Sequence, residues 1–124
     1  MSNLFFEKIQ LEIVSSAIDD VHGLYEIIWA LNSSHPHVPQ IEKINQSKLA
    51  IIPLIDNDII DIYQCYRNEN PAERLVKNDA LAIVLENKNW DVTQSIDNQY
   101  YGFYSSGQKC LDEEKRLVTA QTSL

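Results

Sequence analysis

The side chains that could carry chemistry in this sequence are few and widely spaced. His35 and His37 lie two residues apart, and imidazole pairs of this kind can bind transition metals. Only Glu42 follows at a short distance, whereas a tetrahedral metal site needs three or four ligands. Cys65 and Cys110 are far apart and form no CxxC pair, so we expect two small core residues. The sequence therefore predicts no metal site.

The candidate nucleophiles and bases also lack the setting that catalysis requires. Ser105 and Ser106 are not surrounded by a GxSxG nucleophile elbow, so we interpret them as a turn or a helix cap. His22 lies at helical spacing from Asp19 and Glu26, which predicts a surface ion pair or a cap. The chain has three glycines and contains neither a P-loop nor a GxGxxG phosphate loop. We therefore expect no cofactor and no enzymatic activity.

Carboxylates and tyrosines gather between residues 56 and 66, where an acidic turn precedes a predicted strand. Aromatic side chains within a charged rim are typical of protein interfaces. A second acidic group lies near the C-terminus, and further aromatic residues lie at positions 100–104. The candidate partner-binding residues are Asp56, Asp58, Asp61, Tyr63 and Tyr66, with Asp112, Glu113 and Glu114 as the second acidic group.

The net charge indicates which kind of partner fits such a surface. Eighteen acidic and ten basic residues leave a formal charge of -8 at neutral pH. Nucleic acid is bound through lysine and arginine residues that displace counterions, so this balance opposes nucleic-acid binding and favours a basic protein partner. No run of 18 apolar residues and no secretory signal pattern is present, so we expect a cytoplasmic protein without a membrane segment.

The length of 124 residues fits one domain, which we assign to residues 1–124. Apolar residues at steps of three and four predict two helices in the first thirty residues, with a break near residues 16–19. Residues 1–18 would form an N-terminal helical arm, and Trp29 would face the core from the second helix. The prolines and serines of residues 33–39 predict a loop.

A third helix is predicted over residues 40–55, with Ile41 facing inward and Lys43 facing outward. Pro53 leaves two alternatives open: one helix over this range, or two short helices separated by a turn at residues 46–48. Asn57 is a plausible stop, because asparagine tolerates the left-handed conformation of a helix C-cap.

The second half of the sequence alternates between strand and helix patterns. A strand is predicted up to Tyr66, a polar turn at residues 67–74, a helix at 80–86 and a loop with Trp90 at 87–97. A second strand at 100–104 and a helix at 107–118 follow, and residues 119–124 should fray. These elements predict a mainly helical α+β fold with a small antiparallel hairpin or sheet.

Two segments resemble the winged helix-turn-helix superfamily: residues 54–63, LIDNDIIDIY, and residues 100–111, YYGFYSSGQKCL. They are similar to the end of a recognition helix with the first wing strand, and to the second wing strand with a terminal helix. The resemblance covers about residues 19–117 and implies a three-helix core with extra helices. In DNA-binding members the helix before the wing lies in the major groove. By this resemblance, the DNA-facing residues would be Lys43, Asn45, Gln46 and Lys48.

Two functions remain as expectations from the sequence. The first is a noncatalytic acidic module that binds a basic partner protein, of which an immunity protein that neutralises a basic nuclease toxin is one instance. The alternative is a winged-helix transcriptional regulator that binds DNA as a dimer through its N-terminal helix. Two lysines beside three carboxylates make a weak phosphate-binding surface, so the first function is favoured.

Overall fold

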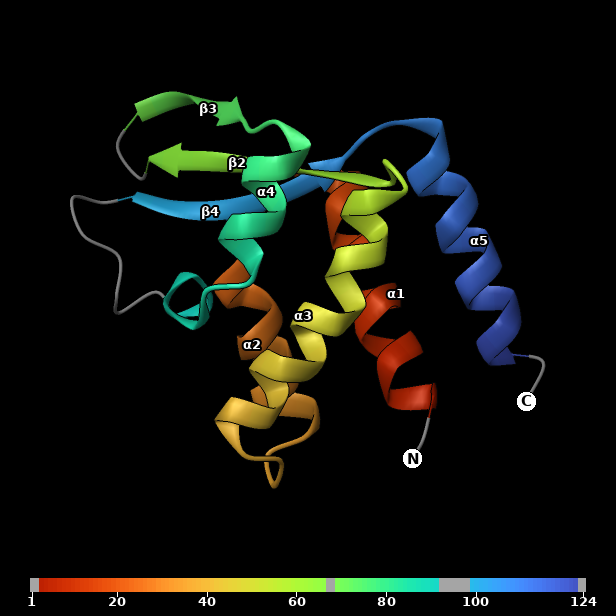
Figure 1. Cartoon of the computed structure of the whole chain (residues 1–124). Coiled ribbons are helices and arrows are strands. Elements are labelled where there is room, and N and C mark those ends of the chain that lie inside the picture. The colour runs from red at the N-terminus through yellow and green to blue at the C-terminus, as the bar shows by residue number, and fades with distance from the viewer. Residues whose placement is uncertain (1–2, 67–68, 92–98, 123–124) are drawn as a thin grey trace.

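A computed structural model describes residues 3–66, 69–91 and 99–122 of the chain (Figure 1). It is a mainly helical α+β fold with a small antiparallel sheet, as the sequence predicts. The helices are α1 (Asn3–Asp19), α2 (Leu24–Ser34), α3 (Gln40–Asp56), α4 (Lys77–Val84) and α5 (Gln108–Thr122), with a 3-10 turn η1 (Asn87–Trp90). The strands are β1 (His22–Gly23), β2 (Ile60–Tyr66), β3 (Glu69–Arg74) and β4 (Gln99–Ser105).

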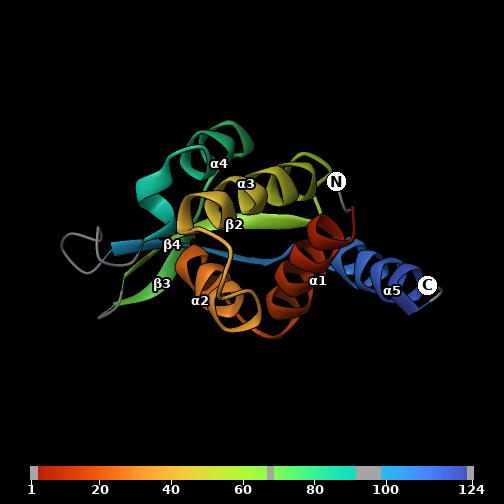
Figure 2. The ribbon, with the colours of Figure 1, turned by 90° about the horizontal axis from the view of Figure 1, so that it is seen from below.

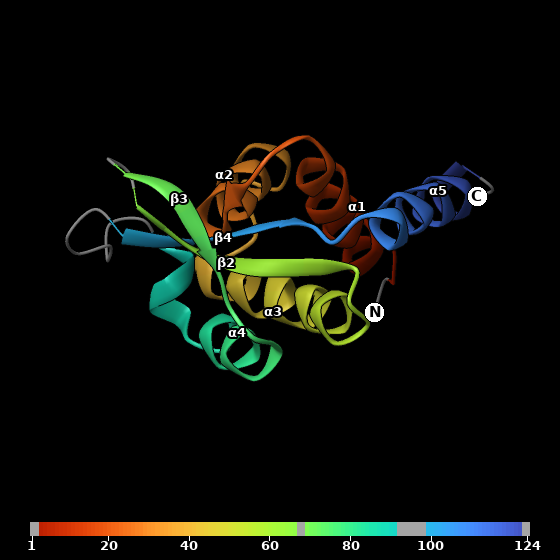
Figure 3. The same cartoon turned by 90° about the horizontal axis from the view of Figure 1, so that it is seen from above.

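The sheet has the strand order β1-β4-β2-β3, and each neighbouring pair is antiparallel. The central pair runs in continuous register from Ile60 opposite Ser105 to Tyr66 opposite Gln99. Seen from below, α1, α2 and α3 lie in front of the strands (Figure 2). Seen from above, β2 and β4 lie in front of the helices (Figure 3). The helices therefore cover one face of the sheet, which we call the inner face, and leave the opposite outer face open.

The core lies between the inner face and the helices. Ile62 and Phe103 are directly opposite each other in the sheet, and each is at most 1% exposed. The first helix contributes Ile9, Ile13 and Ala17, which are fully buried, and α1 also packs against α3 and α5. The residues predicted to form an N-terminal arm are therefore part of the core. The apolar face expected to serve a dimer is covered by this chain itself.

Helix α3 is one continuous helix, which settles the alternatives that Pro53 left open. Proline lacks the N–H that would bond to the carbonyl of Leu49, and Leu49 is exposed, so water can bind that carbonyl instead. Asn57 ends the helix as predicted, and its backbone and side-chain nitrogens both donate to Pro53 O. The left-handed residue is Asp58 rather than Asn57, at φ 59°.

Three predictions about local structure are wrong. Residues 69–74 form the edge strand β3 rather than a polar turn, and Pro71 is tolerated there because an edge strand has one unpaired side. Residues 119–122 continue α5 instead of fraying. Helix α4 begins at Lys77, three residues before the predicted start. Residues 67–68, 92–98 and 123–124, which include the end of the predicted loop and of the tail, lie outside the described residues.

The orientation of α3 differs from the prediction at two positions. Lys43 is only 3% exposed, although we expected it to face outward, and Ile41 is 53% exposed, although we expected it to face inward. The Nζ atom of Lys43 donates a hydrogen bond to Asn32 Oδ1 on α2 at 2.9 Å. This bond supplies one polar partner for the buried ammonium group and turns this side of α3 towards α2.

Candidate functional site

The outer face of the sheet is built from alternate residues of β2 and β4. Side chains on a strand point to opposite faces in turn, and residues directly opposite each other share a face. Because Ile62 and Phe103 face the core, their neighbours in sequence face outward. The outer-face residues of this central pair are Asp61, Tyr63, Cys65, Tyr100, Gly102 and Tyr104.

Two tyrosines and an ion pair occupy the half of the outer face nearer the start of β2. The rings of Tyr63 and Tyr104 meet edge to face, with centroids 6.3 Å apart. Arg74 lies opposite Tyr63 on β3, and its Nη1 atom is 3.8 Å from Asp61 Oδ2. Partial burial, with the Asp61 carboxylate as a smaller cause, raises the pKa of Tyr63, so this phenol is neutral at physiological pH.

An aromatic cluster of Trp29, Tyr25 and Tyr100 occupies the other end of the outer face. The rings of Tyr25 and Trp29 have centroids 4.7 Å apart, and those of Tyr25 and Tyr100 are 5.7 Å apart, both in edge-to-face contact. Trp29 is 57% exposed. Gly23 makes room for this arrangement, because a Cβ atom at that position would lie 2.3 Å from Tyr25 Cε1.

The prediction that Trp29 belongs to the core is wrong. The apolar stripe of α2 consists of Leu24, Ile27, Ile28 and Leu31, which are all buried. Trp29 lies outside this stripe at 100° per residue, so the helix turns its ring away from the core. The spacing of the stripe could have shown this, but the hydrophobicity of tryptophan suggested burial. The sequence reasoning therefore missed the cluster.

Glu26 provides the charged group beside the aromatic cluster. The backbone N–H of Gly23 donates to Glu26 Oε2 at 2.6 Å, which satisfies a donor at the start of α2. The other carboxylate oxygen is 3.3 Å from His22 Nδ1. These contacts match the predicted ion pair or cap. In the sequences of β1, α2 and β4, Glu26 and His22 are the only residues of acidic or basic type.

The acidic turn, which we define as Asp56, Asp58 and Asp61, is accompanied by cations of the same chain. Lys77 Nζ lies 3.0 Å from Asp58 Oδ1 and donates to the backbone oxygen of Asp56 at 2.9 Å. Through this hydrogen bond and its charge, Lys77 lowers the pKa of Asp58. Asp61 is paired with Arg74, as described above. The predicted negative surface is therefore partly neutralised within the chain.

The remaining predicted contact residues do not belong to the outer face. Tyr66 has the inner-face register, opposite Gln99, and is partly exposed at the end of its strand. On α5, Arg116 donates to both carboxylate oxygens of Glu113, and Asp112 accepts a hydrogen bond from Gln108. Glu114 is half-buried. The structure thus brings Asp61 and Tyr63 together on the outer face and leaves Tyr66 and the second acidic group outside it.

The residues proposed for DNA contact do not form one exposed basic surface. Lys43 is buried, which corrects its predicted place on the outer side of α3. Lys48 Nζ donates to Asn87 Oδ1, and Gln46 donates to Glu42 at 3.0 Å. Asn45 is exposed.

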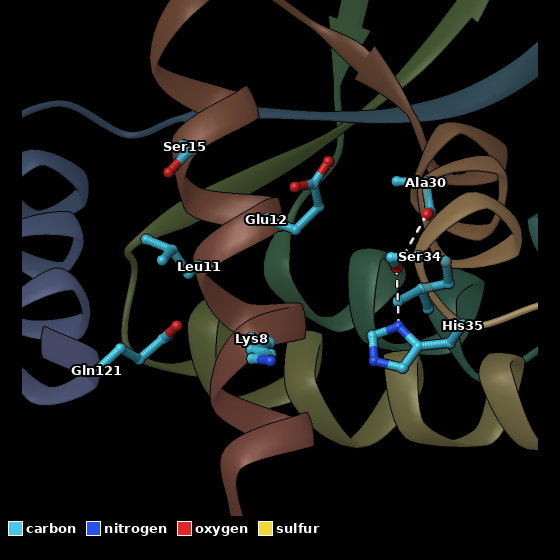
Figure 4. A pocket seen from close by; sticks show the side chains of 9 residues that line it. Lys8, Leu11, Glu12, Ser15, Ala30, Ser34, His35 and Gln121 are labelled. Atoms are coloured by element: carbon cyan, nitrogen blue, oxygen red, sulfur yellow. Dashed lines mark hydrogen bonds between the residues drawn. The ribbon is translucent and has the colours of Figure 1, made fainter. Parts of the chain in front are cut away.

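A groove of about 540 Å³ lies beside α1 (Figure 4). Its lining includes Lys8 and Glu12 of α1, Ser34 of α2, and the following residue His35. Ser34 Oγ lies 3.1 Å from the Ala30 carbonyl and 2.8 Å from His35 Nδ1. The single hydroxyl proton is used towards the carbonyl, so His35 donates to Ser34 and does not accept its proton. This geometry does not activate a serine nucleophile.

Cys65 and Cys110 are buried free thiols, as predicted, and burial raises the pKa of both. Within residues 3–66, 69–91 and 99–122, no three histidine, cysteine, aspartate or glutamate side chains are placed to hold a metal ion. In the same ranges, no helix has the length and apolar character to cross a bilayer. No protein-family model, curated protein or solved structure matches this chain.

Proposed function

We propose that this chain is a noncatalytic interaction module that binds a basic partner protein through the outer face of its sheet. The observation that carries this proposal is the aromatic content of that open face. Tyr63, Tyr104 and Tyr100 lie on it in partly exposed positions, and Trp29 on α2 is joined to Tyr100 through the ring of Tyr25. Tyrosine and tryptophan supply large contact areas with few rotatable bonds and are enriched at the centres of protein interfaces.

The charge of the chain supports a basic partner. Cations at three places on the described surface lie beside carboxylates of the same chain: Arg74, Lys77 and Arg116. The chain as a whole has more acidic than basic residues and a formal net charge of -8. Long-range attraction between such a protein and a basic partner accelerates their encounter and weakens as salt is added.

A toxin-neutralising immunity protein is one instance of this class that fits the size and charge of the chain. Two segments of the sequence resemble a winged-helix scaffold. On that scaffold the recognition helix corresponds to α3. Its buried Lys43 and exposed Ile41 and Leu49 are poorly suited to phosphate contact, so we do not propose DNA binding as the function.

A partner-recovery experiment tests this proposal. The purified chain is immobilised and exposed to lysate of the source cell, bound proteins are identified by mass spectrometry, and each candidate is then purified and titrated directly. We expect a basic protein whose affinity falls steeply between 50 mM and 300 mM salt. The double substitution Tyr63→Ala with Tyr104→Ala should abolish its recovery.

The matched control removes exposed apolar side chains elsewhere on the surface. Leu111→Ala with Val118→Ala changes two residues on α5 that are 39% and 43% exposed. This variant should recover the partner as the unchanged chain does, with both variants shown by circular dichroism to be folded. Recovery only of acidic proteins, salt-insensitive binding, or equal loss in both variants would contradict the proposal.

A further inference from the structure

The aromatic cluster has the composition of a site for a cationic side chain. Its three rings come from α2 and β4, and each neighbouring pair meets edge to face. An edge-to-face arrangement leaves ring faces directed away from the partner ring, and such faces carry the negative part of the aromatic quadrupole. Trp29, whose indole gives the strongest attraction to cations, is the most exposed of the three.

The charges around the cluster reinforce this preference. Glu26 lies one turn before Trp29 on α2 and keeps a side-chain exposure of 38%. Helix α2 and strand β4 contain no lysine or arginine. A cation that approaches the rings therefore meets a carboxylate nearby and no basic residue within these two elements. At the acidic turn, Lys77 and Arg74 lie beside the carboxylates.

We infer that the aromatic cluster binds an arginine side chain of the basic partner, which rests on the function proposed above. The guanidinium group would stack on the exposed indole of Trp29. Arginine suits this place better than lysine, because its guanidinium is planar, stacks on aromatic faces and is more weakly hydrated than an ammonium group. The inference assigns the partner an exposed arginine and places it at the α2 end of the outer face.

A peptide titration tests this inference without the native partner. The probe is the capped peptide Gly-Arg-Gly-Arg-Gly-Arg-Gly at 20 mM salt, and two matched peptides carry lysine or neutral citrulline in place of arginine. Trp29 supplies the signal, because Trp90 is fully buried and its indole is out of reach of the peptide. We expect the arginine peptide to change the fluorescence saturably, the lysine peptide to bind several-fold more weakly, and the citrulline peptide to have no effect.

Two variants connect the signal to the cluster. Trp29→Leu, followed by calorimetry, should weaken the arginine peptide by about two- to fivefold, the range expected for an exposed cation–π contact. The control Leu85→Ala removes a side chain of equal exposure, 57%, from the end of α4 and should leave the affinity unchanged. Equal binding of the arginine and citrulline peptides, or an unchanged affinity in Trp29→Leu, would overturn the inference.

The partner-recovery experiment separates this inference from the proposed function. If Trp29→Leu recovers the partner in full while Tyr63→Ala with Tyr104→Ala loses it, the proposed function is supported and the arginine site is wrong. If the arginine peptide binds at Trp29 but no basic partner is recovered, the site stands and the proposed function is wrong.

Discussion

The acidic turn and the aromatic cluster lie at opposite ends of the same strand pair, and the chain uses their side chains differently. At the acidic turn, Lys77 of α4 and Arg74 of β3 lie beside the carboxylates. At the aromatic cluster, the only carboxylate on the contributing elements is Glu26, and the largest ring is more than half exposed. We therefore expect the aromatic cluster, rather than the acidic turn, to make the closer contact with a cationic side chain of the partner.

This difference teaches that carboxylates counted along a sequence overstate the negative charge that a partner meets. Exposed ion pairs contribute little to stability, but they neutralise the charges that they join. Helix α2 and strand β4, which carry the aromatic cluster, contain no lysine or arginine. We therefore expect the acidic turn to contribute mainly to long-range attraction and the aromatic cluster to contribute mainly to the contact itself.

The largest effect that we predict tests whether the aromatic cluster is surface rather than core. Trp90 is fully buried, and its Nε1 atom donates to Val84 O at 2.9 Å. Trp90→Ala should lower the free energy of unfolding by about 3–5 kcal/mol, as for other large core truncations. Trp29→Ala should lower it by about 1 kcal/mol or less, because most of its ring is already in water. Urea unfolding followed by circular dichroism measures both, and similar losses would remove the distinction.

The second prediction disturbs the backbone beneath the aromatic cluster. A Cβ atom at position 102 would lie 2.8 Å from the backbone oxygen of His22 and 3.0 Å from Val21 Cγ1. Gly102→Ala must therefore push β1 and β4 apart, and we expect a loss of about 1–3 kcal/mol in the free energy of unfolding. The exposed substitution Lys115→Ala should change it by less than about 0.5 kcal/mol. If the two variants have equal stability in urea, the close approach of the strands is not as described.

Helices and strands of this fold were predictable where regularly spaced apolar residues form a buried face. The α1 and α2 stripes and the strands β2 and β4 follow apolar spacing that the core requires. Strand β3 was missed because Pro71 and its polar neighbours resemble a turn, and an edge strand needs pairing on one side only. Lys43 was misplaced because its partner Asn32 lies on a different helix, which no local pattern reveals.

The candidate site was predictable in part for a similar reason. The tyrosines of β2 and β4 were recognised because they are concentrated in two short segments that pair with each other. The neutralising pairs of the acidic turn join residues 13 to 19 positions apart, and their geometry depends on how β3 returns along β2. The aromatic cluster joins residues of α2 to Tyr100 of β4 across the chain. Contacts of this length follow from tertiary packing rather than from spacing.

The third prediction separates the structural role of Glu26 from its charge beside the aromatic cluster. Glu26→Gln keeps a side-chain oxygen that can accept from the Gly23 N–H but loses the charge assistance and the pairing with His22. We expect the free energy of unfolding to fall by about 0.5–1 kcal/mol, because a neutral amide interacts more weakly with the start of a helix than a carboxylate does. Urea unfolding followed by circular dichroism measures this loss, and an unchanged stability would show that the charge of Glu26 does not contribute.

The smallest effect concerns the acidic turn and is a change in titration rather than in stability. Lys77 lowers the pKa of Asp58 below its ordinary value of 3.8, so the ionised carboxylate stabilises the fold above that pH. This contribution disappears as the pH falls through the folded pKa. Lys77→Gln removes the ammonium group and should return the pKa of Asp58 towards 3.8, as measured by NMR titration of its carboxyl carbon. The control Lys115→Gln changes an exposed lysine on a different helix, α5, and should leave the pKa of Asp58 unchanged. Because Lys77→Gln also leaves the Asp58 carboxylate without its ion pair, a basic partner should associate faster with this variant at low salt. An unchanged pKa of Asp58 would show that Lys77 does not neutralise the acidic turn.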